Sequence, residues 1–237
     1  MPEVPSRRRL LLVLGAVLVI LAAVNVADKF GPRHTGLVAG PLVAAGLVLL
    51  ARVAGLGWHD LGLSRRTLLP GLRYAVGAVL AVAVVYSAGA ALPWTRPAFH
   101  DVRYHLHLGA ALLTALIVVP LGTVLLEEVA FRGVLLGLVR RHRGATWASI
   151  TSSVLFGLWH ILPSLRLGSA NQAVGSVLGP GRVLTVLAAV AFTALAGLLL
   201  CELRRRSGSL LATAALHWAT NGLGILLTAA LATARFA

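Results

Sequence analysis

The stretch LGAALLTALIVVPLGTVLLEEVAFRGVLLGLV, which runs from Leu108 to Val139, decides the fold of this chain. Within this stretch, residues 108–126 carry no charge, and then Glu127, Glu128 and Arg132 follow within six positions. A charge at the centre of a bilayer costs ~2.5–3.5 kcal/mol on insertion scales. An apolar helix that keeps three charges at this depth is expected to pair them or to use them in a site.

The composition around this stretch is that of a polytopic membrane protein. Of 237 residues, 58% are hydrophobic and 12% are charged, and the mean hydropathy is +0.89. A spanning helix needs ~20 residues, and seven apolar segments approach that length. They are Leu10–Ala27, Thr35–Leu50, Tyr74–Leu92, Leu108–Val139, Thr146–Leu162, Val183–Cys201 and Ser209–Thr233. We therefore predict an all-α transmembrane bundle of about seven to eight membrane helices.

Three details of these segments lead to further expectations. A break or tilt is expected near Pro120–Gly122, and Asn221-Gly222 would allow the last segment to be two half-helices that make an eighth crossing. Gly36 and Gly40 have the spacing that permits close helix packing. The connection 163–182 is rich in Gly and Ser, so a mobile solvent loop is expected there, with a cover over one mouth of the bundle as the alternative.

The basic residues predict orientation in the membrane. The net charge is +14, but the Lys and Arg residues lie at the ends of apolar segments, which argues against a nucleic-acid partner. With the N-terminus in the cytoplasm, thirteen arginines fall on the inner side and seven basic residues on the outer side, as the positive-inside rule requires. Arg7-Arg8-Arg9 then precede an uncleaved first helix, and the protein is expected in the cell membrane. The single Cys201 has no intrachain disulfide partner.

The Glu127–Arg132 motif suggests a division of roles. Glu128 and Arg132 are four residues apart and share a helical face, so they can pair. Glu127 points about 100° away from Glu128 and is then free to face a cavity as a general base. The alternative is a helix that surfaces here with solvated charges, but the apolar residues 133–139 argue against it.

Two further motifs lie on other apolar segments. Phe156-Gly-Leu-Trp-His160 and His217-Trp-Ala-Thr-Asn221 each place two residues on one helical face. With this topology, Glu127, His160 and Asn221 each lie about 18–20 Å from the cytoplasmic end of their segment, at ~1.5 Å per residue. Each motif alone is as typical of packing as of chemistry, but the shared depth predicts one site.

The residue types favour hydrolysis by water. A carboxylate and a neutral imidazole can together deprotonate a water molecule, and a second imidazole and an amide can donate to an oxyanion. Neither serine nor cysteine has the neighbours of a nucleophilic dyad. Glu127, His160 and His217 are equally suited to a divalent metal such as zinc. The chain lacks an H-E-x-x-H motif, so the spacing does not specify a metal site; we favour a metal-free site, with a divalent metal such as zinc as the alternative.

At these residues the chain resembles the CPBP family, the CAAX-protease and bacteriocin-processing membrane proteins. The motifs E-E-x-x-x-R, F-x-x-x-H and H-x-x-x-N occur in that order as EEVAFR, FGLWH and HWATN. The resemblance implies an intramembrane endopeptidase for a membrane-associated polypeptide, such as a CAAX-type or bacteriocin-like substrate, with a cavity open toward the cytoplasm.

The resemblance also implies roles and a division of the chain. Glu127 and His160 would activate water, and His217 and Asn221 would stabilise the oxyanion. Glu128 and Arg132 would hold the geometry of the site. Residues 108–237 would form the catalytic membrane core, preceded by about three membrane helices in residues 1–107.

Two other functions stay open. Buried Glu, Arg and His also mark proton paths, so a small proton-coupled transporter is one alternative, although no inverted repeat is found. The other is a non-catalytic scaffold or immunity protein of the same fold.

Overall fold

The computed structural model describes residues 7–32, 35–179 and 182–233, and within these ranges the elements are helices joined by turns and irregular connections, without a strand. Six stretches are long and apolar enough to cross a membrane. The first three are α1 (Arg7–Phe30), α2 (Thr35–Val53) and η1–α3 (Arg65–Thr67 and Leu68–Ala91). The last two are α10 (Arg182–Ser207) and the helix that begins with α11 (Leu210–Trp218) and ends with α12 (Gly224–Thr233).

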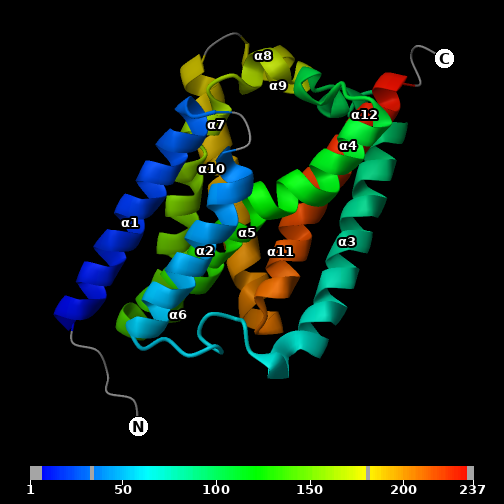
Figure 1. Cartoon of the computed structure of the whole chain (residues 1–237). Helices are drawn as coiled ribbons and strands as arrows, with labels where there is room; N and C mark the ends of the chain where they lie inside the picture. Colours follow the sequence, from blue (N-terminus) through cyan, green and yellow to red (C-terminus); the bar gives the residue numbers. More distant parts are fainter. Residues whose placement is uncertain (1–6, 33–34, 180–181, 234–237) are drawn as a thin grey trace.

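The fourth stretch, Leu108–Ser164, contains two of the seven predicted segments. It begins with α4 (Leu108–Leu113), continues through α5 (Leu125–Glu128) into α6 (Leu136–Trp159), and ends in α7 (Ile161–Ser164). Within α6 the chain turns at Gly144, whose φ of 84° is in the left-handed region that favours glycine. In Figure 1 the chain descends from α4 to this turn and returns upward to α7.

Wider π-helical turns join the pieces of two of these helices. One carries Glu127, Glu128 and Arg132, and we call it the motif helix; the other is the last helix, which carries His217 and Asn221. The turns are η4 (Thr114–Val118), η5 (Pro120–Val124), η6 (Val129–Leu135) and η7 (Ala219–Leu223). Of the break or tilt expected near Pro120, the break is wrong, because η5 accommodates the proline within a continuous helix. The last stretch is also continuous through η7, so the described residues give no eighth crossing. Such π turns are frequent at functional sites.

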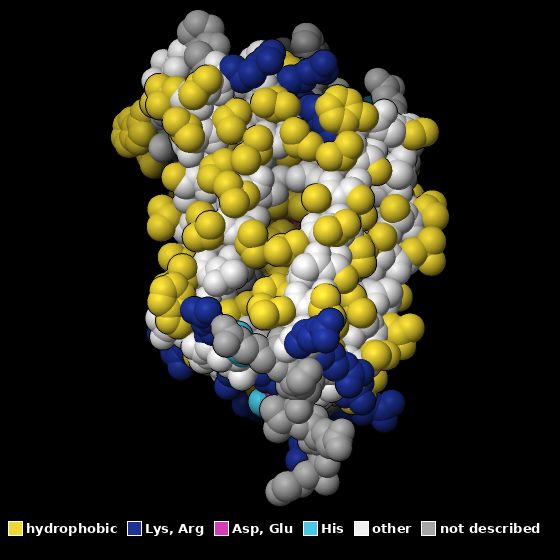
Figure 2. Space-filling view, turned by 90° about the vertical axis from the view of Figure 1, so that its left-hand side faces the viewer, with side chains coloured by type: hydrophobic (Ala, Val, Ile, Leu, Met, Phe, Trp, Pro, Cys, Tyr) yellow, Lys and Arg dark blue, Asp and Glu magenta, His cyan; other side chains and the backbone are white. Residues whose placement is uncertain are grey.

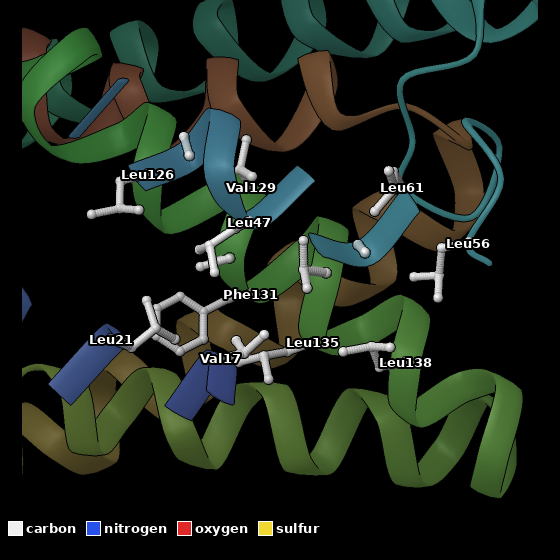
Figure 3. Packing of buried hydrophobic residues seen from close by; sticks show 14 of the residues in the cluster. Val17, Leu21, Leu47, Leu56, Leu61, Leu126, Val129, Phe131, Leu135 and Leu138 are labelled. Carbon is white, nitrogen blue, oxygen red and sulfur yellow. The ribbon is translucent and has the colours of Figure 1, made fainter. Parts of the chain in front are cut away.

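The core lies where α1, α2 and the motif helix meet. Figure 3 shows Val17 and Leu21 of α1 and Leu47 of α2 around Phe131 and Leu135 of η6. These five side chains are at most 4% exposed. Deleting such a buried side chain to alanine typically costs about 2–5 kcal/mol, so this packing fixes the motif helix against the N-terminal helices.

Close backbone contact joins α2 to η5. A Cβ atom added at Gly40 would lie 2.6 Å from the carbonyl oxygen of Leu121, and one at Gly36 would lie 2.9 Å from that of Gly122. Both positions therefore require glycine for this approach, as the spacing of Gly36 and Gly40 predicts.

The outer surface is suited to lipid. Large apolar side chains are exposed, among them Val19 (70%), Leu42 (68%) and Phe192 (72%). Figure 2 shows hydrophobic side chains over the middle of one face, with Lys and Arg toward its upper and lower ends. Together with the apolar helices, this confirms an integral membrane protein built as a helical bundle.

The two edges of the bundle are distinct. The start of α1 lies at one edge with the connections 54–64, 140–145 and 208–209, and we call this the basic edge (Figure 1). The opposite edge carries the end of α12 and two long connections, 92–107 and 160–181. The latter contain η2 (Arg96–Phe99), η3 (Val102–Tyr104), α8 (Leu167–Ala170) and α9 (Gln172–Leu178). Arg33 and Arg235 of the predicted outer side lie outside the described residues.

Candidate active site

Glu127 is a buried carboxylate at the middle of the motif helix. It is 5% exposed, and its Oε1 accepts a hydrogen bond from Trp159 Nε1 at 3.0 Å. Its Oε2 has no hydrogen-bond partner among the described residues and lies 3.8 Å from His217 Nε2. One oxygen is therefore oriented by the protein, while the other is buried without a hydrogen bond from the described residues.

Behind Glu127 lies a buried charged cluster. Glu128 Oε1 accepts hydrogen bonds from Arg132 Nη1 and His217 Nδ1, both at 2.9 Å. The Arg132 side chain is fully buried, and its guanidinium carbon lies 3.9 Å from the centre of the Phe156 ring. The four-residue spacing of Glu128 and Arg132 predicts this pair, and a buried pair leaves neither charge uncompensated.

His160 has a defined tautomer. Its Nδ1 lies 2.8 Å from the carbonyl oxygen of Phe156, and a carbonyl only accepts, so Nδ1–H donates. In the neutral ring Nε2 then keeps its lone pair and can act as a base. The ring also packs edge-to-face on Phe156 at 4.6 Å between centroids. Phe156 and His160 are therefore in contact, as their four-residue spacing predicts, although α6 ends at Trp159, one residue before His160.

Glu127, His160 and Asn221 line one cavity of about 890 Å³. Asn221 belongs to η7, and its side chain has no hydrogen bond to another described residue. Most small-molecule pockets measure about 300–1,000 Å³, so this cavity has room for a short stretch of extended peptide. The three side chains come from three separate spans, so the motifs do converge on one space.

The remaining motif residues stand behind the cavity wall. Glu128, Arg132 and His217 are at most 7% exposed and do not line the cavity. His217 is oriented by Glu128 and faces Glu127, whereas Asn221 lines the cavity. The expected shared role of His217 and Asn221 at the oxyanion stays a prediction.

Connections at the edge opposite the basic edge form part of the cavity wall. Asn171 and Asp101 form an isolated antiparallel bridge, and Asn171 Nδ2 donates to Ala98 O at 2.9 Å. Arg103 pairs with Asp101 at 2.6 Å, and this hydrogen bond raises the pKa of Arg103. Residues 160–179 of this connection are therefore not the solvent loop expected from its composition but a structured cover, which was the alternative.

The sequence motifs missed three residues of this site. Trp159 was a neighbour of His160 without a role, yet it orients Glu127. Asn25 and Asp28 of α1 line the cavity; Asn25 Nδ2 donates to the Trp159 carbonyl at 2.9 Å. Asp28 accepts a hydrogen bond from the Gly36 amide, and its carboxylate is close enough to Glu127 for the two acidic groups to interact electrostatically. The only sequence indication for Asp28 was a charge directly after the apolar segment Leu10–Ala27.

A metal site does not emerge from the same residues. In the part of the chain that the structure describes, no three His, Cys, Asp or Glu side chains are grouped as metal ligands. Whether activity needs a metal stays a prediction.

Comparison with known proteins agrees with the motifs. Residues 109–223, which include all six motif residues, match the family model described as Type II CAAX prenyl endopeptidase Rce1-like. Searches of curated proteins and of solved structures find no match. Residues 109–223, just under half of the chain, therefore match the CPBP family, to which the Rce1-like CAAX endopeptidases belong.

Proposed function

We propose that this chain is an endopeptidase that hydrolyses a membrane-associated polypeptide with a water molecule activated by Glu127 and His160. The observation that carries the proposal is the Glu127 carboxylate: one oxygen is oriented by Trp159, the other has no partner among the described residues, and both belong to a side chain that lines a cavity. A general base needs this combination of fixed orientation and access to the reacting water.

The proposed reaction assigns a role to each of the three residues that line the cavity. Glu127 takes a proton from water, and the hydroxide attacks the carbonyl carbon of the scissile bond. The Asn221 amide donates to the oxyanion of the tetrahedral intermediate. The proton then passes to the leaving amine as the C–N bond breaks, with Nε2 of His160 as the relay. The products are a carboxylate and an amine.

The buried cluster has a supporting role in this proposal. His217, Glu128 and Arg132 compensate one another and present the Nε2 edge of His217 to Glu127. We assign them to positioning, with no metal in the mechanism. A chelator should therefore leave the rate of the purified enzyme unchanged, and loss of activity restored by added Zn²⁺ would support the metal alternative.

The test uses purified protein in proteoliposomes with a library of labelled peptides, with and without a prenylated CAAX end. Glu127→Gln keeps the size of the side chain but cannot take a proton, so cleavage should vanish. Glu202→Gln, at an exposed carboxylate, is the matched control and should retain wild-type rates. Cleavage that survives in Glu127→Gln would overturn the proposal.

The same variants separate the other functions. A proton-coupled transporter would show substrate flux in these liposomes without peptide products. A scaffold or immunity protein would keep its cellular role in Glu127→Gln. The proposed assignment to the cell membrane, with the N-terminus in the cytoplasm, is tested below.

A further inference from the structure

The cavity lies in the half of the bundle away from the basic edge. On each span, its lining residues lie around the middle or toward the other end. Asp28 is near the end of α1, Tyr86 is near the end of α3, and Thr185 is near the start of α10. The rest of the wall includes residues from both long connections, 92–107 and 160–181.

Toward the basic edge the path from Glu127 is filled by packed side chains. Phe131, Val134, Leu135 and Leu138 follow Glu127 down the motif helix and are at most 2% exposed. Leu56 and Leu61, from the connection at the basic edge, belong to the same buried cluster as Leu135 and Leu138 (Figure 3). An apolar groove between α3 and α10 does lie in this half of the bundle, but none of the motif residues lines it.

The two edges differ in charge. The basic edge carries thirteen arginines: Arg7, Arg8, Arg9, Arg52, Arg65, Arg66, Arg73, Arg140, Arg141, Arg143, Arg204, Arg205 and Arg206. The described residues near the opposite edge, toward which the cavity lies, include five basic ones: Lys29, Arg96, Arg103, Arg166 and Arg182. The acids do not alter this difference, because Asp60 and Glu202 belong to the basic half and Asp28 and Asp101 to the other. The excess marks the basic edge as cytoplasmic.

We infer that the active-site cavity admits its substrate from the non-cytoplasmic side of the membrane. This inference rests on the proposed function and narrows its substrate class to polypeptides exposed outside the cytoplasm, such as secreted peptides or extracytoplasmic segments of membrane proteins. A cytoplasmic N-terminus and a cavity open toward the cytoplasm, both expected from the sequence, cannot hold together in this fold.

Cysteine labelling tests the orientation without depending on catalysis. In a Cys201→Ala background, Ser169→Cys places a thiol at an exposed position of the connection 160–181, and Thr146→Cys places one beside the turn at the basic edge. With a membrane-impermeant maleimide on intact cells, the cysteine at position 169 should react and that at position 146 should react only after permeabilisation. Labelling of denatured protein confirms that both thiols are present. The reverse pattern, or equal labelling of both in intact cells, would overturn the inference.

A second experiment tests access by the substrate. Right-side-out and inside-out vesicles that contain the full chain are given a membrane-impermeant peptide that the purified enzyme cleaves. Only the right-side-out vesicles should produce Glu127-dependent fragments, and cleavage confined to inside-out vesicles would overturn the inference. If the purified enzyme cleaves no peptide at all, the proposed function fails, while the labelling result still decides which edge faces the cytoplasm.

Discussion

At the scale of single residues, Trp159 is the clearest feature that the motifs did not predict. Its indole N–H orients a carboxylate that is otherwise without a partner on its second oxygen. A hydrogen bond to a charged group contributes about 1.5–3 kcal/mol. Because this bond fixes the proposed base, its loss should appear mainly in the rate of the chemical step.

Trp159→Phe keeps the aromatic bulk and removes the donor. We expect kcat to fall roughly 10- to 100-fold, as the loss of that hydrogen bond implies, while KM changes little. Steady-state kinetics of the purified protein measures both. The control is Trp147→Phe at an exposed tryptophan of the same helix, and equal kinetics for the two variants would remove Trp159 from the site.

Arg132 is expected to matter for stability. Arg132→Met would remove the buried cation that pairs with Glu128, and breaking a buried ion pair typically costs about 3–5 kcal/mol. Thermal unfolding in detergent should show a large fall in Tm. Arg205→Met removes an exposed partner of Glu202 and should have little effect, because exposed pairs contribute little. A similar Tm for both variants would contradict the proposed role of the cluster.

Residue-level prediction succeeded where local spacing determines geometry. The Glu128–Arg132 pair and the contact of His160 with Phe156 follow from positions four apart along one helix. The engagement of His217 by Glu128 joins residues 89 positions apart, so no local spacing could predict it. Trp159 was missed for the same reason.

At the scale of elements, the packing of α2 against η5 brings the N-terminal helices to the site. Gly40→Ala would place a methyl group 2.6 Å from the Leu121 carbonyl oxygen, so the helices must separate. Such overpacking typically costs about 1–3 kcal/mol, and activity should fall with Tm because Glu127 follows η5 directly.

Gly46→Ala is the matched control on the same helix, since a Cβ there meets nothing within 4 Å. It should be neutral or stabilising by up to about 1 kcal/mol. Tm and cleavage rates of both variants in detergent measure the difference. If Gly40→Ala is as stable as Gly46→Ala, the close approach of α2 and η5 is not needed.

The apolar pattern predicted the spans because the bilayer fixes their length. It did not predict the π-helical turns, since residues 114–135 and 219–223 have no composition that separates a π turn from an α turn. Pro120 was therefore expected to break a helix that η5 keeps continuous.

At the scale of the whole molecule, the cavity joins residues from both parts of the chain. Asn25 and Asp28 lie outside residues 109–223, the region that matches the family model. The motifs identified residues that converge on one space, but the volume of the cavity and the edge toward which it lies depend on how seven segments pack. That arrangement could not be read from any one of them.

The most direct test of the account compares membrane-associated and secreted peptides from cells that express either the wild-type chain or Glu127→Gln, with quantitative mass spectrometry of new peptide ends. Equal amounts of the two proteins in the membrane are required. The account predicts a set of cleavage products that are present with the wild-type chain and absent with Glu127→Gln. Identical peptide profiles from cells that contain the true substrate, or products that persist with Glu127→Gln, would contradict it.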